Sequence, residues 1–260
     1  GPKRGDPLVD AMAQAKSGLM NVMRSRDGAP VKMDATLIDA ITGLYAFQAA
    51  SMALWGKQPG SGARHLDINL MQCAAHIQAP NILEWDFVGR PPGLLNPPAG
   101  NYRTKDGWLA ITLVNEAHFK GICSAIGKPD LAKDPRFATV LSRKENVAAL
   151  RAILDAAIAE RGTADWVAAM TGEGALASAI NTYGDWLADE HFKATEAAPP
   201  YRLATGETTR IPHLPGQPPN VAAVPAIGEH SAAVLKGLGI GDAEVEKLIA
   251  SGTVRTAATN

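Results

Sequence analysis

Two proline-rich stretches constrain the fold of this 260-residue chain more than any other feature of its sequence. Four prolines lie between residues 89 and 101, and seven of the chain's eighteen prolines lie between residues 195 and 228. Neither a helix interior nor a central strand tolerates this density, because proline lacks a backbone N–H and has a fixed φ. We therefore expect two folded parts. The first stretch would be a linker or site loop, and the second a long surface connection.

The composition is that of a globular protein. Hydrophobic residues make up 46% of the chain and charged residues 20%, which is enough apolar surface for a core. The net charge of −1 leaves no basic field that would attract a polyphosphate backbone. No apolar run reaches the roughly 18 residues of a membrane-spanning helix, and no signal-peptide pattern opens the chain. We expect a cytoplasmic protein that binds neither nucleic acid nor membrane.

Common catalytic motifs are missing from the sequence. There is no phosphate loop, no two-histidine zinc helix and no nucleophile elbow, since Gly60-Ser61-Gly62 continues with Ala63. The two cysteines, Cys73 and Cys123, lie far apart in apolar helical patterns, which predicts buried free thiols. We expect no metal site and no cofactor.

Apolar periodicity predicts most of the secondary structure. Residues 6–88 carry patterns typical of helices, with one short strand expected at 64–70, where Leu66, Ile68 and Leu70 alternate with polar residues. Further helices are predicted over 116–127, 142–160, 163–171, 229–238 and 242–250.

A turn signal and two helix-start signals complete the prediction. An Asp106-Gly107 pair between two strand-like runs predicts a β-hairpin. Thr163 and Asp242 are the expected N-caps of the helices that follow them.

The first predicted helix carries the most suggestive polar residues. Asp6 followed by Pro7 predicts its start, as an N-cap followed by proline at the first helical position. Asp10 then lies in the first turn, where the helix dipole favours the ionised form that a carboxylate nucleophile requires. Asp10, Gln14 and Ser17 line one polar face. From spacing alone, the more common explanation is that Asp10 is an ordinary first-turn acid.

Seven short runs are individually weak but specific in their order and separation: Pro7–Gly18, Asp39–Ala46, Gly62–Met71, Tyr102–Leu109, Asp134–Phe137, Leu214–Gly216 and Gly228–His230. On these runs the chain resembles the family III CoA-transferases, the CaiB/BaiF family that includes formyl-CoA transferase. The resemblance extends over nearly the whole chain and begins partway through the family pattern. The catalytic carboxylate of the family matches Asp10.

The resemblance implies an α/β fold. It would combine the C-terminal part of a Rossmann-like large domain with a small α+β domain, in an interlocked homodimer. The implied divisions are 1–70 for the later part of the large domain, 71–95 for a linker helix, 96–190 for the small domain, 191–214 for a linker and 215–260 for the return to the large domain.

The resemblance also implies a reaction, the movement of CoA from an acyl-CoA thioester to a free carboxylic acid. Asp10 would form an aspartyl anhydride and then an aspartyl-CoA thioester. Because both intermediates hydrolyse readily, a loop should exclude water, and residues 89–101 are the candidate. The CoA thioester is the substrate, and no cofactor is implied. Beside Asp10, the candidate substrate-binding residues are Gln14, Ser17, Asn96 and Gly100.

Two alternatives stay open. The 2-methylacyl-CoA racemases of the same superfamily use an Asp at this position, and Glu116 stands where their catalytic Glu would fall. Their helix usually reads Gly-His-Asp-x-Asn-Tyr, whereas here Val9 precedes Asp10 and Met12-Ala13 follow it, so transferase is favoured. The other alternative is a non-catalytic fragment that requires a partner chain.

The N-terminal part of the family pattern, which forms the nucleotide-binding half of the large domain, has no match in this sequence. The apolar helix faces of residues 1–70 would then lie uncovered, which soluble monomers rarely tolerate. We therefore expect a second chain that supplies this half, in addition to a homodimer.

Overall fold

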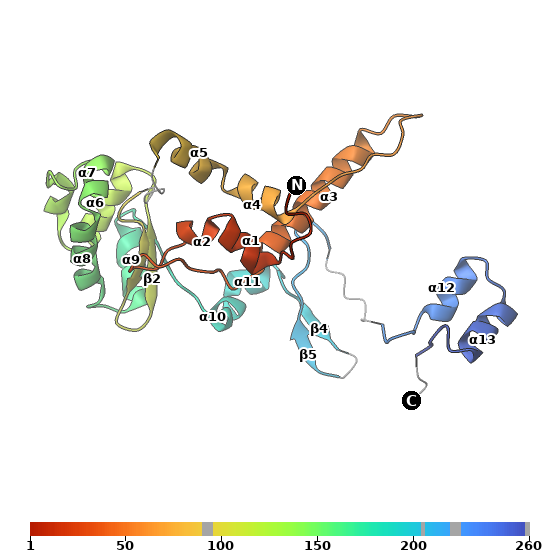
Figure 1. Cartoon of the computed structure of the whole chain (residues 1–260). Helices are drawn as coiled ribbons and strands as arrows, with labels where there is room; N and C mark the ends of the chain where they lie inside the picture. The colour runs from red at the N-terminus through yellow and green to blue at the C-terminus, as the bar shows by residue number, and fades with distance from the viewer. Residues whose placement is uncertain (90–95, 204–205, 219–224, 258–260) are drawn as a thin grey trace. The chain divides into compact units, whose positions relative to one another are not determined.

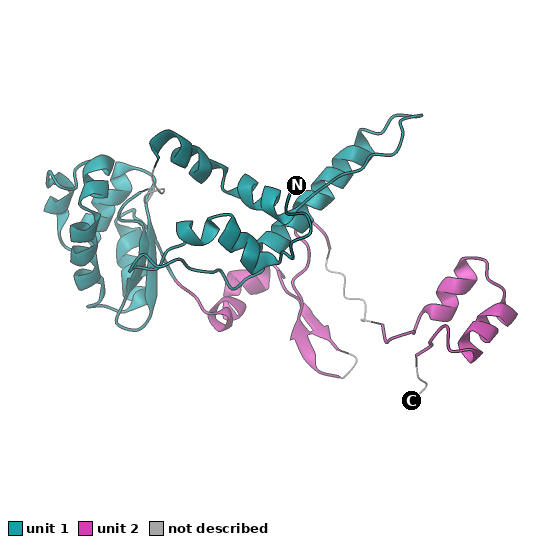
Figure 2. Cartoon of the chain, in the orientation of Figure 1, with its two compact units in different colours: residues 1–179 teal, residues 180–260 magenta. Residues whose placement is uncertain are grey.

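The computed structural model describes residues 1–89, 96–203, 206–218 and 225–257. Its described part combines helices with small sheets (Figure 1). The chain divides into two compact units, residues 1–179 and 180–260 (Figure 2).

The regular structure in the first 89 residues of unit 1 is helical, as the apolar patterns predict for most of this region. The helices are α1 (Asp10–Lys16), α2 (Leu19–Val22), α3 (Leu37–Trp55), α4 (Leu70–Ile77) and α5 (Ala79–Val88). Helix α1 packs against α2, α3 and α4. A small core forms where Ala13, Leu19, Ile38 and Ala74 meet.

Two expectations for this region are wrong. Helix α1 begins at Asp10 with Val9 as its N-cap, not at Pro7 after Asp6. The Asp10 side chain accepts a hydrogen bond from the backbone at the start of α3, a tertiary contact that local capping preferences do not include. The expected strand at 64–70 does not form. None of the described residues pairs with it, and a strand without a neighbour leaves its backbone groups unpaired.

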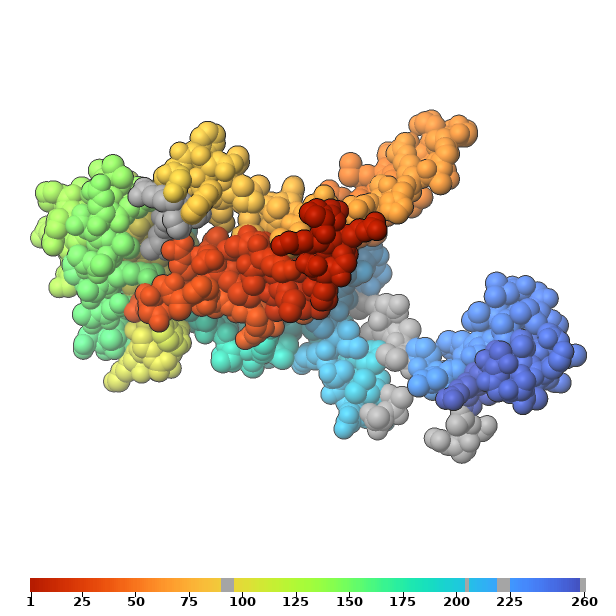
Figure 3. All heavy atoms as spheres, viewed as in Figure 1, coloured from red at the N-terminus to blue at the C-terminus, as the bar shows by residue number. Residues whose placement is uncertain are grey.

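Helix α3 stands out because its surface is largely uncovered. Ile38 is its only buried residue, and the C-terminal part of the helix lies at the surface in Figure 3. By length and composition alone it could span a membrane, with a mean hydropathy of 1.3 over 18 residues. Counting consecutive apolar residues missed it, because Asp39, Thr42 and Gln48 interrupt the run. One such helix is weak evidence for a membrane protein.

The rest of unit 1 is a three-stranded antiparallel sheet with helices. The sheet has the order β1 (Gly100–Arg103), β2 (Trp108–Thr112), β3 (Leu176–Ala179). The helical segments are α6 (Glu116–Ala125), the 3₁₀ turn η1 (Pro129–Lys133), α7 (Val140–Glu145), α8 (Val147–Ile158) and α9 (Thr163–Gly172). The hairpin predicted at Asp106-Gly107 is confirmed as the β1–β2 turn. The core packs Leu109 and Ile111 of β2 against Phe119, Leu154 and Trp166.

Three helix boundaries differ from prediction for identifiable reasons. The single helix expected over 142–160 is α7 and α8, which meet at Asn146. Gly162, not Thr163, is the N-cap of α9, because Asp106 of the hairpin accepts hydrogen bonds from the Thr163 backbone N–H and hydroxyl. Gly241, not Asp242, caps the last helix, and Asp242 pairs instead with Lys236.

Unit 2 contains short elements. These are α10 (Tyr183–Ala188), α11 (Glu190–Ala194), β4 (Pro200–Arg202), β5 (Thr208–Arg210), α12 (Ser231–Gly237) and α13 (Asp242–Ala250). Strands β4 and β5 form an antiparallel hairpin inside the stretch that its prolines mark as a connection. Both cysteines, in unit 1, are buried free thiols, as predicted.

Candidate active site around Asp10

The carboxylate of Asp10 lies at the start of a second helix. Its Oδ2 accepts hydrogen bonds from the backbone N–H groups of Ile38, at 2.7 Å, and Asp39, at 3.2 Å. These N–H groups belong to the first turn of α3, which has no side-chain cap of its own. Asp10 is only 8% exposed. The carboxylate thus lies at the N-terminus of a 19-residue helix, which is the positive end of the helix dipole.

Gln14 holds the other oxygen of Asp10. Its Nε2 donates to Asp10 Oδ1 at 2.5 Å and to the carbonyl oxygen of Met33 at 3.1 Å, and its Oε1 accepts from the Met33 N–H at 3.0 Å. The Gln14 residue is fully buried, with 0% exposure. The structure thus brings two of the predicted site residues together, although Gln14 contacts protein groups where a substrate contact was expected.

Ser17 lies one turn beyond Gln14, and its hydroxyl bonds to a group other than the Asp10 carboxylate. Its hydroxyl donates to the carbonyl oxygen of Gln14 at 3.3 Å. It also lines a cavity of about 540 Å³ together with Asn21, Arg24, Gln78, Asn81 and Trp85. The cavity lies between the α1–α2 turn and the start of α5, and neither Asp10 nor Gln14 lines it.

The candidate loop is only partly described. Its residues 90–95 lie outside the described residues. Asn96 donates from Nδ2 to the carbonyl oxygen of Leu113 at 2.9 Å. Gly100 begins β1, where a Cβ would collide with the guanidinium of Arg151. Both predicted residues are therefore in contact with the three-stranded sheet of unit 1 or with the segments next to it.

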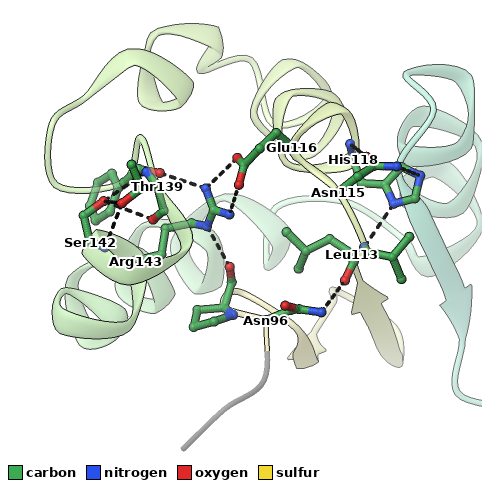
Figure 4. Close-up of polar contacts among 11 residues, drawn as sticks. Asn96, Leu113, Asn115, Glu116, His118, Thr139, Ser142 and Arg143 are labelled. Carbon is green, nitrogen blue, oxygen red and sulfur yellow. Dashed lines mark hydrogen bonds and ion pairs between the residues drawn. The ribbon is translucent and has the colours of Figure 1, made fainter.

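Arg143 anchors the end of this loop, and the sequence analysis missed it (Figure 4). Its Nε donates to the Pro97 carbonyl at 3.0 Å, and its Nη1 donates to the Phe137 carbonyl at 3.0 Å. Tyr102 donates its hydroxyl to the next loop carbonyl, that of Pro98, at 2.5 Å. Burial raises the pKa of Tyr102 to about 12, so its hydroxyl stays a donor. No sequence pattern marks Arg143, because its partners come from three separate segments.

Glu116 completes the Arg143 cluster. Its two carboxylate oxygens accept from Nη1 and Nη2 of Arg143 at 2.9 and 2.7 Å (Figure 4). These hydrogen bonds hold the pKa of Glu116 below its usual range. A carboxylate bound on both oxygens with a lowered pKa is a weak base near neutral pH. The geometry suits a structural role better than the proton transfer that the racemase alternative assigns to Glu116.

The described residues contain no group of three or more His, Cys, Asp or Glu side chains placed to hold a metal ion. The chemistry that the described part offers near Asp10 is that of a single buried carboxylate with amide donors around it.

Comparison with known proteins identifies relatives. The model of CoA-transferase family III matches residues 1–231. The chain is 27% identical to succinate–glutarate CoA-transferase of Agrobacterium fabrum over 249 residues, covering 92% of this chain and 62% of the relative. It is 27% identical to succinyl-CoA:glutarate CoA-transferase of Mus musculus, covering 98% of this chain and 61% of the relative.

A solved structure shares the fold. The crystal structure of a CaiB/BaiF family protein from Brucella suis matches with a TM-score of 0.73 and 28% identity, covering 92% of this chain and 65% of that one. The chain therefore spans less than two thirds of the length of these relatives.

Proposed function

Because the chain belongs to CoA-transferase family III, we propose that it moves CoA from an acyl-CoA thioester to a free carboxylic acid, with Asp10 as the nucleophile. The observation that carries this proposal is the environment of Asp10. The carboxylate is buried and accepts hydrogen bonds from two backbone N–H groups and one amide, so its position is fixed. A nucleophile needs such a fixed position to attack efficiently.

A carboxylate suits this transfer for a thermodynamic reason. When Asp10 attacks the thioester carbonyl, the C–S bond breaks and CoA leaves as a thiolate, and the acyl group stays activated as an anhydride. The thiolate then attacks the Asp10 carboxyl carbon and releases the donor acid, which leaves an aspartyl-CoA thioester. An acceptor carboxylate reverses these steps. A serine ester would lose the activation that an anhydride and a thioester keep.

The relatives suggest the class of acid. Those from Agrobacterium fabrum and Mus musculus are named for succinate and glutarate, which are short dicarboxylic acids. We propose short dicarboxylic acids as the first acceptors to test and succinyl-CoA as the first donor. A CoA thioester substrate also favours a cytoplasmic location.

The uncovered surface of α3 bears on assembly. Large apolar side chains project from it, with Phe47 73% and Leu54 72% exposed. Exposed apolar patches of this kind mark protein interfaces. We propose that a second polypeptide covers this helix, either a second copy in an interlocked dimer or a separate partner chain. We also propose the division of the chain into a large-domain part, a small domain and linkers at the boundaries that the family resemblance implies.

The test measures the transfer of CoA between acids. Purified protein would be mixed with succinyl-CoA and a panel of short acids, and new acyl-CoA would be separated by chromatography. Asp10→Asn should abolish transfer while the fold is kept, because an amide has the shape of the carboxylate but lacks the attacking oxygen. Asp39→Asn is the matched control, since Asp39 contacts Asp10 only through its backbone N–H and its side chain is exposed. Retained turnover in Asp10→Asn would rule out this nucleophile.

A further inference from the structure

We propose that Gln14 is a positioning residue that makes Oδ1 the attacking oxygen of Asp10 while Oδ2 stays on the backbone of α3. The inference rests on the proposed role of Asp10 as nucleophile. It assigns the two oxygens different tasks and gives Gln14 a task other than substrate binding.

The two oxygens of Asp10 differ in the donors they meet. Oδ2 accepts from two backbone N–H groups, those of Ile38 and Asp39. A carboxylate oxygen has two lone-pair sites, so both sites of Oδ2 are used. Oδ1 accepts from Gln14 Nε2 alone among the described residues. Oδ1 therefore keeps a lone pair with which it can attack an acyl carbon.

The orientation of the Gln14 amide follows from its other partners. The Met33 N–H can donate only to Oε1, and the Met33 carbonyl can accept only from Nε2. This pair of bonds directs the second Nε2 hydrogen at Asp10 Oδ1. Rotating the amide by half a turn would place two acceptors against each other. The donor character of the group facing Asp10 is thus fixed by the fold.

Gln14 also links Asp10 to the segment that precedes the two N–H donors of Oδ2. Met33 lies in the segment that leads into α3, whose first turn carries the Ile38 and Asp39 N–H groups. By bonding both the N–H and the carbonyl of Met33, Gln14 holds that segment against α1. One buried side chain therefore sets both halves of the Asp10 environment. Because Gln14 is 0% exposed, it does this without touching substrate.

The arrangement has a chemical consequence. Attack by Oδ1 on the thioester carbon expels the CoA thiolate, and Oδ1 becomes the bridging oxygen of the anhydride while Oδ2 remains its carbonyl oxygen. When the thiolate attacks Cγ of Asp10, the electron pair of the C=O bond moves onto Oδ2. The two N–H groups are already in place for that charge. The Cγ–Oδ1 bond then breaks, and the donor acid leaves with Oδ1.

The experiment measures how fast acyl-CoA forms a covalent CoA adduct on the Asp10 peptide, by quenched flow and mass spectrometry. Gln14→Met keeps an unbranched side chain of similar length and removes the amide. We expect its rate constant at saturating acyl-CoA to fall by about 100-fold, the order of loss that follows misplacement of a reacting group. The acyl-CoA concentration for half-maximal rate should not change, since Gln14 does not touch substrate.

Gln14→Glu supplies a second test, in which the hydrogen-bond donor at position 14 depends on pH. A carboxyl group at position 14 can donate to Asp10 only while it is protonated, and two adjacent carboxyls hold one proton between them. The adduct rate of this variant should therefore recover as the pH is lowered from about 7 to about 5. The wild-type protein and Gln14→Met should show no such recovery.

The outcomes separate the inference from the function it rests on. A wild-type adduct with unchanged rates in Gln14→Met, a higher half-maximal concentration in that variant, or no recovery in Gln14→Glu would each overturn the role of Gln14 alone. Absence of any adduct on Asp10 in the wild-type protein would overturn the nucleophile proposal and this inference together.

Discussion

Arg143 and Glu116 form an ion pair with two parallel hydrogen bonds, of 2.9 and 2.7 Å. The Arg143 side chain is 1% exposed and that of Glu116 is 50% exposed, so a buried cation reaches out to a half-exposed anion. The guanidinium also lies 4.2 Å from the centre of the Phe119 ring and donates to the Pro97 and Phe137 carbonyls. One side chain thus joins α6, α7 and the end of the candidate site loop.

Removing this guanidinium should cost stability. Arg143→Met leaves two carbonyls without their donor and Glu116 without its partner, so we expect a loss of about 1–3 kcal/mol in the free energy of unfolding. Arg136→Met is the matched control, because Arg136 makes a similar pair with Asp134 at the surface and should cost less than about 1 kcal/mol. Urea denaturation would measure both. Equal losses would contradict the anchoring role of Arg143.

The same pair predicts a pH dependence. The hydrogen bonds from Arg143 lower the pKa of Glu116, so the folded state binds its proton at lower pH than the unfolded state. The resulting stability is present above the ordinary value of 4.5 and is lost as pH falls through the lower folded value. The stability difference between wild type and Glu116→Gln should therefore shrink between about pH 6 and about pH 3. A difference that grows towards acid pH would contradict this sign.

Glu116 also separates transferase from racemase. A racemase would exchange the α-hydrogen of a 2-methylacyl-CoA for deuterium from the solvent, and Glu116→Gln would stop that exchange. Because Glu116 is committed to Arg143, we expect no such exchange in the wild-type protein and continued CoA transfer in the variant. Mass spectrometry of the recovered thioester measures the exchange. Deuterium uptake that depends on Glu116 would support the racemase.

The sequence predicted correctly the elements that depend mainly on residues close together in the chain. The Asp106-Gly107 turn and helices α6, α9 and α13 all lie close to where the pattern placed them. The predictions that failed concern segments whose structure involves residues far away in the sequence. Residues 64–70 alternate like a strand but have no neighbour to pair with among the described residues, and Asp10, the first residue of α1, bonds to a residue 28 positions further along the chain.

For the candidate site, too, some residues were predicted from the sequence and contacts between distant residues were not. The family resemblance pointed to Asp10, and helical spacing put Gln14 on its face. Neither could show that Met33 orients the Gln14 amide, since that contact spans 19 residues. Arg143 was missed because an arginine in a helix carries no signal for a carbonyl 46 residues before it.

Gly121 tests the packing of α6 against the segment that follows α9. A Cβ at this position would collide with the carbonyl oxygen of Glu173 and lie 3.2 Å from the Ala175 nitrogen. Both are backbone atoms that cannot move cheaply, so Gly121→Ala should destabilise by about 1–3 kcal/mol. Gly172→Ala, where the space is open, should be neutral or stabilise by up to about 1 kcal/mol. Thermal unfolding compares the two, and similar melting temperatures would contradict this packing.

The last prediction concerns the exposed face of α3. If a second polypeptide covers it, a charge in that face should weaken association, because burying an unpaired charge is costly. We expect Phe47→Lys to raise the dissociation constant of the assembly by about tenfold or more, the effect of losing an aromatic anchor. Val114→Lys alters an equally exposed apolar residue outside α3 and should leave association unchanged. Sedimentation velocity measures the assembly. A wild-type monomer that binds no apolar dye, or one that binds lipid vesicles through α3, would contradict the proposed protein interface.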